Sequence, residues 1–135
     1  MQRYYDTLAE FERDGFTVIV DKTWEDIPLN YCFDDSIDPE SGKPYYDLKE
    51  MANDIDSGKL EWFMLRVRVL VEGLELGSAY LGGMLYEDPS ECLKDGTAED
   101  MIYEALTEAK KDVYRLKQKF AELSDMVDRE GVSVV

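Results

Sequence analysis

The chain has 135 residues, of which 44% are hydrophobic and 34% charged, and it carries a formal net charge of −16 without a single histidine. This length allows one domain with a real core, and this apolar content excludes a largely disordered chain. The missing histidine removes the commonest general base near neutral pH, and the negative charge disfavours direct binding to nucleic acid or anionic lipid.

The N-terminal segment predicts a helix followed by a strand. Tyr4, Leu8 and Phe11 recur at helical spacing just before a glycine, which predicts a helix over about residues 2–13. The next stretch, "FTVIVDKTW", is rich in β-branched and aromatic residues. It predicts a strand over about residues 16–24.

A loop, a second helix and a β-hairpin follow. Residues 25–44 contain three prolines and many acids, which is typical of a surface loop, and helical periodicity predicts a helix over about residues 45–56. Strict alternation of apolar residues predicts a hairpin over about residues 61–86, turning at Glu72 and Gly73. The expected register pairs Val71 with Leu74, Val69 with Leu76, Val67 with Ser78 and Leu65 with Tyr80, and it places Gly77 opposite Arg68 and Gly82 and Gly83 opposite Phe63 and Trp62.

The hairpin contains "LGSAYLGG", three glycines within eight residues. A phosphate-binding loop needs a following lysine and hydroxyl residue, whereas Met84 and Leu85 follow here. We therefore interpret these glycines as a packing device in a strand and not as a nucleotide site.

The C-terminal segment predicts a long helix over about residues 98–128, with Thr97 as N-cap and Asp100 in its first turn. Its apolar residues follow heptad spacing, so the stripe packs on the sheet or forms a dimer seam; in a parallel dimer Asp112 would meet Lys117 of the partner helix. At about 1.5 Å per residue the helix exceeds the sheet, and we expect it to project beyond about Val113. The stripe comprises Ile102, Leu106, Ala109, Val113, Leu116, Phe120, Leu123 and Val127, of which the last five are the expected oligomer seam.

These elements predict an α+β fold in which a small, mainly antiparallel sheet, formed by a strand at about 16–24 and a hairpin at about 61–86, is covered by helices. We expect one domain over residues 1–135, with the end of the C-terminal helix projecting as an oligomerisation segment. No stretch approaches the roughly 20 apolar residues of a membrane span, and the N-terminus is acidic where a signal peptide is apolar. We expect a cytoplasmic protein.

Chemical sites are poorly supported by the sequence. The stretch "DDSIDPESGKPY" places Asp34 and Asp38 like ligands of a calcium loop, but Pro39 and Tyr45 occupy the glycine and glutamate positions of that motif. Adjacent carboxylates are frequent in a chain with 31 acids, so they do not indicate catalysis. We expect no enzyme, no cofactor and no metal, and two reduced structural cysteines, Cys32 and Cys92.

The acids are unevenly placed. Residues 21–61 contain 12 acids and 4 bases, and residues 87–108 contain 8 acids and 1 base, whereas residues 110–135 contain 5 acids and 6 bases. A rigid acidic surface can occupy the basic channel of a nucleic-acid-binding protein. The expected partner-binding residues are Asp34, Asp35, Asp38, Glu40, Glu99, Asp100, Glu104 and Glu108.

The stretch "LRVRVLVEGLELGSAYLGGMLYE" followed by "EDMIYEALTEAKKDV" resembles small acidic proteins of unknown function encoded by bacteriophages and mobile elements. The resemblance covers about residues 47–115 and implies a setting of host takeover and counter-defence. In that setting DNA-mimic anti-restriction and anti-CRISPR proteins share this size and charge. The basic C-terminal helix departs from the most acidic of those mimics.

We therefore expect a non-enzymatic protein of phage or mobile-element origin, acting in the host cytoplasm, that binds and inhibits a basic nucleic-acid-handling host protein. We also expect it to be a homodimer that contacts neither nucleic acid nor a membrane. Two alternatives remain open: a structural or assembly module that oligomerises through the C-terminal helix, and a metal-dependent enzyme that uses carboxylates.

Overall fold

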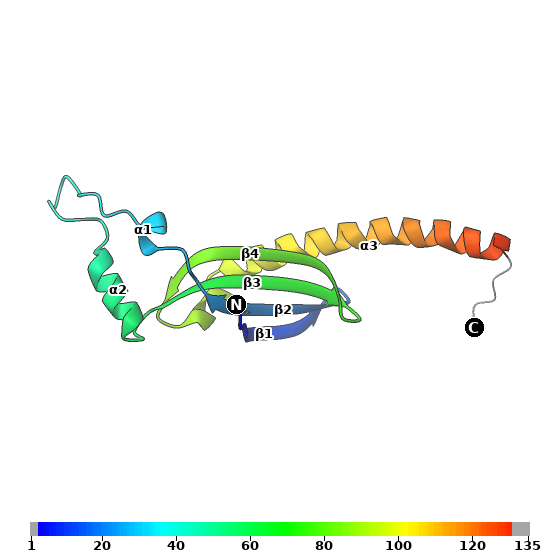
Figure 1. Ribbon diagram of the computed structural model, residues 1–135, viewed down its shortest axis with the longest axis horizontal. Coiled ribbons are helices and arrows are strands. Elements are labelled where there is room, and N and C mark those ends of the chain that lie inside the picture. The colour runs from blue at the N-terminus through cyan, green and yellow to red at the C-terminus, as the bar shows by residue number, and fades with distance from the viewer. Residues whose placement is uncertain (1–2, 131–135) are drawn as a thin grey trace.

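The computed structural model describes residues 3–130 and shows a four-stranded antiparallel sheet with the strand order β1-β2-β3-β4 (Figure 1). The predicted α+β class, with its antiparallel sheet and long C-terminal helix, is confirmed. The elements are β1 (Asp6–Arg13), β2 (Phe16–Trp24), α1 (Leu29–Cys32), α2 (Leu48–Asp56), β3 (Glu61–Val71), β4 (Leu74–Tyr86), the 3-10 helix η1 (Pro89–Leu93) and α3 (Thr97–Glu130).

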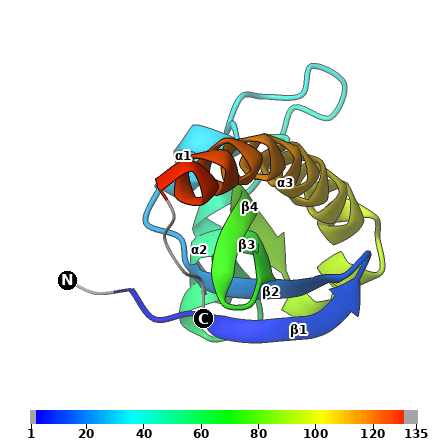
Figure 2. The ribbon, with the colours of Figure 1, turned by 90° about the vertical axis from the view of Figure 1, so that its right-hand side faces the viewer.

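The hydrophobic core lies between the sheet and the first half of α3 (Figure 2). Alternate residues of β2 and β3 face this core because side chains of a strand point to opposite faces in turn. On α3 the buried residues recur every three to four positions and end at Ala109. The buried apolar residues of β2 and β3 include Val18, Val20, Phe63, Leu65, Val67 and Val69, and the helix contributes Ala98, Met101, Ile102, Ala105, Leu106 and Ala109.

The helix predicted over residues 2–13 is wrong, because this segment forms the edge strand β1. Asp14 and Gly15 both have positive φ angles, 55° and 85°, which is the backbone of a two-residue hairpin turn. Leu8 and Phe11 contact the core from the strand, with Phe11 paired to Val18. Their spacing fits one face of a helix, but the Asp-Gly turn and the free edge of β2 favour strand pairing.

The predicted turn of the β3–β4 hairpin is confirmed, since Glu72 and Gly73 have φ angles of 49° and 78° and Val71 pairs with Leu74. The register expected beyond the turn is wrong. A bulge follows the pair Leu70–Glu75 and a second one lies between Phe63 and Leu65, and each extra residue shifts all later pairs. The observed pairs are Val69–Gly77, Arg68–Ser78, Val67–Ala79, Leu65–Leu81, Phe63–Met84 and Trp62–Leu85.

The glycines of "LGSAYLGG" allow close packing, but against other partners than those predicted. A Cβ atom on Gly77 would lie 2.1 Å from the carbonyl oxygen of Ala105, so Gly77 lets α3 approach β4. A Cβ atom on Gly83, whose φ is +71°, would lie 2.9 Å from the sulfur of Cys32, the last residue of α1. The same eight residues therefore position both α3 and the segment that follows β2.

The start of α3 is predicted to within a residue, but its cap is not the expected one. The Asp100 amide donates to the carbonyl of Gly96 at 3.1 Å, so Gly96 and not Thr97 is the N-cap residue. The Asp95 carboxylate accepts a hydrogen bond from the Thr97 amide at 2.9 Å. An acidic side chain thus caps α3 from one position before Gly96.

Candidate functional site

The acidic loop, residues 25–47, is tied to β3 and β4 at its base. One carboxylate oxygen of Glu25 accepts a hydrogen bond from the Gly83 amide at 2.9 Å, and the other accepts from the Ile27 amide at 3.0 Å. The Trp62 indole donates to the Ile27 carbonyl at 2.9 Å. Glu25 is therefore an anchor of the loop, whereas composition alone counts it with the acidic surface.

Two of the predicted loop acids hold the turns of the loop. Asp34 accepts from the Ser36 amide at 2.7 Å, and Asp38 accepts from the Glu40 amide at 2.9 Å and from the Ser41 hydroxyl at 3.2 Å. These bonds are the local turns that aspartate favours. Asp35 and Glu40 are exposed and form no ion pair among residues 3–130.

The acidic loop also displays aromatic side chains. Tyr31 is 77% exposed and Tyr45 is 59% exposed. In the same loop, Phe33 packs edge-on against Tyr46 with ring centres 5.1 Å apart, and its ring lies tilted against that of Trp62 at 5.9 Å. Such ring pairs favour one fixed arrangement of the rings. The loop thus presents tyrosines and carboxylates from an anchored base.

Of the four helix acids, Glu99 is not free. Its two carboxylate oxygens accept hydrogen bonds from Arg13 at 3.0 and 3.1 Å. These bonds hold the pKa of the Glu99 carboxyl below its ordinary value and raise the pKa of the Arg13 guanidinium. Lys110 donates to Asp14 at 2.8 Å nearby. Glu99 therefore helps fasten the β1–β2 turn to α3.

The other three helix acids form the acidic stripe, Asp100, Glu104 and Glu108, at successive i, i+4 positions on α3. All three are exposed and none forms an ion pair within the described part of the chain. The acidic loop lies at one end of the molecule and the stripe on the first turns of α3 (Figure 1). The predicted acidic surface consequently comprises two patches on different elements.

The predicted apolar heptad stripe divides where α3 leaves the sheet, and the expected oligomer seam is its projecting part (Figure 1). Ile102, Leu106 and Ala109 are buried in the core, whereas Val113, Leu123 and Phe120 are exposed, Phe120 by 60%. The expected projection beyond Val113 is therefore observed. Leu116 is partly buried and packs against the core, and Val127 is also partly exposed.

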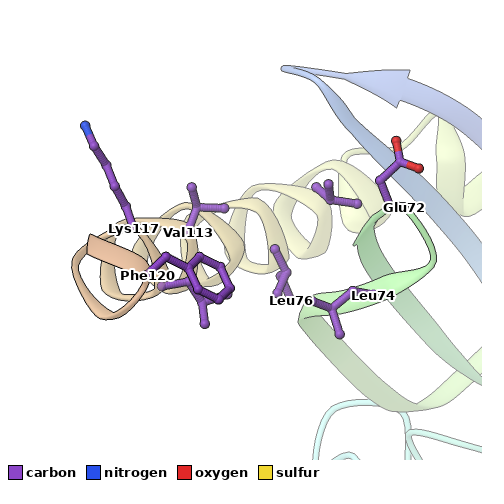
Figure 3. Close-up of a pocket in the computed structure, with 8 residues that line it drawn as sticks. Glu72, Leu74, Leu76, Val113, Lys117 and Phe120 are labelled. Carbon is purple, nitrogen blue, oxygen red and sulfur yellow. The ribbon is translucent and has the colours of Figure 1, made fainter. Parts of the chain in front are cut away.

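An apolar groove of about 540 Å³ lies between the projecting helix and the tip of the β3–β4 hairpin (Figure 3). Figure 3 shows Val113 and Phe120 on the helix side and Leu74 and Leu76 on the hairpin side. Leu74 is 57% exposed. The lining is formed by Val71, Glu72, Leu74, Leu76, Val113, Leu116, Lys117 and Phe120.

Sequence reasoning missed a buried ionic cluster on β2 and β3. Asp21, 2% exposed, accepts hydrogen bonds from Arg66 at 2.7 and 2.8 Å and from Arg68 at 3.3 Å. The hydrogen bonds to Asp21 raise the pKa of Arg66, whose guanidinium lies 3.4 Å from the centre of the Tyr5 ring. The signal available in sequence was one acid, Asp21, and two arginines, Arg66 and Arg68, inside apolar strand patterns; the structure pairs Asp21 with Arg66.

The structure shows no metal site between residues 3 and 130, and one of its two thiols is buried. No group of three or more Asp, Glu or Cys residues in this range could hold a metal ion. Cys92 is fully buried, and burial raises the pKa of its thiol to about 11. Cys32 is exposed. In the same range, no helix has the length and apolar composition that crossing a bilayer requires.

Comparison with protein-family models, with curated proteins and with solved structures gives no match for this chain. The phage and counter-defence setting implied by the sequence resemblance therefore stays a prediction.

Proposed function

We propose that the protein is a non-enzymatic binder of a basic protein surface and that its acidic patches make the contact. The observation that carries this proposal is that Asp35, Glu40 and the acidic stripe are exposed and form no ion pair within residues 3–130. An uncompensated field of this sign attracts lysine and arginine and speeds encounter with a basic partner.

The kind of partner follows from the sign and size of the charge. A net charge of −16 repels nucleic acid, whereas a channel that binds nucleic acid is lined with lysine and arginine. We therefore propose a nucleic-acid-handling host protein as the target, inhibited in the host cytoplasm in the manner of DNA-mimic, anti-restriction or anti-CRISPR proteins.

The tyrosines of the acidic loop support contact with a protein. Tyrosine is enriched in protein interfaces because its ring supplies contact area at a small cost in side-chain entropy. Exposed rings such as Tyr31 and Tyr45 can also stack on guanidinium groups. We therefore expect arginine in the part of the target that meets the acidic loop.

Charge reversal tests this proposal with a matched control. Asp35→Lys, Glu40→Lys and Glu104→Lys together change exposed acids of both patches, and Glu122→Lys, Asp125→Lys and Asp128→Lys make the same total change on the projecting helix. We expect capture of a nucleic-acid-binding protein from bacterial lysate, competed by duplex DNA or RNA. The first triple variant should bind it at least about tenfold more weakly, and the control triple variant should bind like the wild type.

The dependence of binding on salt concentration can contradict this proposal. Binding through the acidic patches weakens as ionic strength rises, because the exposed charges are screened. A tight complex that survives the first triple variant and shows little response to salt would show that the acids do not make the contact.

A second function, assembly into a homodimer, is favoured by the exposed apolar stripe beyond Val113 and by the groove beside it. We propose that this half of α3 self-associates. Phe120→Asp should give a monomer in light scattering, whereas Tyr114→Asp, which changes another exposed aromatic residue of α3, should leave the dimer intact. A wild-type monomer at high micromolar concentration would contradict this second proposal.

A further inference from the structure

The apolar stripe of α3 changes its surroundings at Val113. Before this residue the stripe is covered by the sheet, and after it the stripe faces the apolar groove and then solvent. The hairpin tip, residues 71–76, contributes Leu74 and Leu76 to the same groove. Whatever covers the stripe must therefore share its space with the hairpin tip.

This arrangement argues against a parallel dimer with the full seam. In a parallel pair the stripes of two helices face each other at matching residues, about 8–10 Å between axes. The hairpin tip of each copy already stands beside Val113 to Phe120, on the side of the seam. Two such tips would meet between the helices, so that only Leu123 and Val127 would remain for contact.

We infer that a second copy of this chain covers the stripe in antiparallel orientation, with its last helical turns entering the groove beside the hairpin tip. The inference rests on the proposed self-association and adds its geometry. In this orientation the sheets of the two copies lie at opposite ends of the shared seam. The C-terminal end of α3 in each copy then lies in the apolar groove of the other copy, beside its hairpin tip.

Heptad spacing gives the register. Antiparallel helices pair a positions with d positions, which here places Leu116 against Val127 of the second copy and Phe120 against Leu123 of the second copy. The flanking positions then bring Lys117 to Ser124 and Lys119 to Met126 of the second copy. Neither of these two flanking pairs brings like charges together.

Charge also favours a second copy at this place. Residues 110–130 contain 5 acids and 6 bases, whereas residues 1–109 contain 26 acids and 9 bases. Two copies of a protein with net charge −16 therefore meet through their nearly neutral part, and the antiparallel orientation keeps the acidic bodies apart.

The ion pair expected for a parallel dimer does not oppose this orientation. In the structure Asp112 accepts a hydrogen bond from Arg115 of its own helix at 2.9 Å, so it already has a cationic partner. An exposed pair between Asp112 and Lys117 of a partner would in any case contribute little, because water and salt screen it. Steric exclusion by the hairpin tips decides the orientation.

Distance measurements between spin labels separate the orientations. Labels are attached to Glu122→Cys or Asp128→Cys in a Cys32→Ser background; Cys92 is buried and stays unmodified. In the antiparallel register the two labels at position 122 lie side by side, whereas those at position 128 are separated by about 13 residues of helix, or ~20 Å along the axis. A parallel dimer gives equal short distances at both positions.

The outcomes distinguish the two proposals. A longer distance at 128 than at 122 supports the antiparallel dimer, and equal distances overturn it while leaving self-association intact. A monomer at all accessible concentrations overturns both.

A surface variant tests the role of the hairpin tip without disturbing the core. Leu74→Ser should weaken dimerisation at least about fivefold in sedimentation equilibrium, while Leu81→Ser, the same change at an exposed leucine of β4 outside the groove, should not. Equal dimerisation of both variants and the wild type would overturn the contact between the hairpin tip and the second copy.

Discussion

Gly77 of β4 lies directly beneath Ala105 of α3, so closely that a Cβ atom on Gly77 would be 2.1 Å from the Ala105 carbonyl oxygen and 2.9 Å from the Ala109 amide nitrogen. Both obstacles are backbone atoms of a helix, which cannot rotate away as a side chain can. The contact fixes how closely α3 packs on the sheet and therefore how the projecting half of α3 is aimed.

Gly77→Ala should lower the free energy of unfolding by about 3 kcal/mol, because the methyl group forces α3 away from β4 and opens the core. Urea denaturation monitored by circular dichroism gives this value. Ser78→Ala, one residue along β4, should change stability by less than ~0.5 kcal/mol. Similar stability of the two variants would show that α3 adjusts without cost.

Asp21→Asn should lower the free energy of unfolding by about 2–4 kcal/mol, because Arg66 and Arg68 lose the carboxylate that they share within the sheet. Glu99→Gln breaks an exposed pair with Arg13 and should cost less than ~1 kcal/mol. Both values come from denaturant unfolding at pH 7. Equal losses for the two substitutions would contradict the assignment of Asp21 as a buried structural charge.

The sequence predicts the strands β2, β3 and β4 and the helix α3 well, because each carries a long and regular apolar pattern. The pattern of β1 is ambiguous, since Leu8 and Phe11 fit either a helix face or an edge strand. The bulges of the β3–β4 hairpin cannot be recognised from the alternation of apolar residues, which is the only basis for predicting the register. Each bulge adds one residue to β4, at Leu76 and at Gly82.

The candidate site likewise has features that the sequence predicts and features that it does not. The exposed seam beyond Val113 follows from counting helix length against sheet length, which sequence allows. Which acids are free does not follow, because the partners of Glu99 and Glu25 come from Arg13 and Gly83, far away in the chain. Net charge therefore predicts that an acidic surface exists, and only the tertiary contacts show which carboxylates can meet a partner.

Alkaline pH should destabilise the protein through Cys92. Its pKa rises from 9.0 to about 11 on burial, so the folded state holds the proton more tightly than the unfolded chain does. The folded state is therefore disfavoured progressively between pH 9 and 11, by roughly 3 kcal/mol at most.

The measurement compares unfolding free energies at pH 8 and pH 10.5 for the wild type and Cys92→Ala. The variant should lose less stability over this range than the wild type, although Tyr86, whose pKa is raised mainly by its hydrogen bond to Asp95, contributes in both. In the native wild type at pH 8 a thiol reagent should modify Cys32 and spare Cys92. Equal modification of both thiols would show that Cys92 is accessible.

The acidic loop should be loosened by a single methyl group at Gly83. Gly83→Ala places a Cβ atom 2.9 Å from the Cys32 sulfur, whereas Gly58→Ala, at a similar positive φ of +84°, meets no atom within 4 Å. Both variants bear a backbone strain of roughly 1–2 kcal/mol, so their difference isolates the contact with Cys32. Hydrogen exchange should become faster in the acidic loop of Gly83→Ala only, and the added Cys32→Ala substitution should restore it. Equal exchange in both glycine variants would mean that Gly83 does not hold the loop in place, and weaker target binding by Gly83→Ala would tie that anchoring to function.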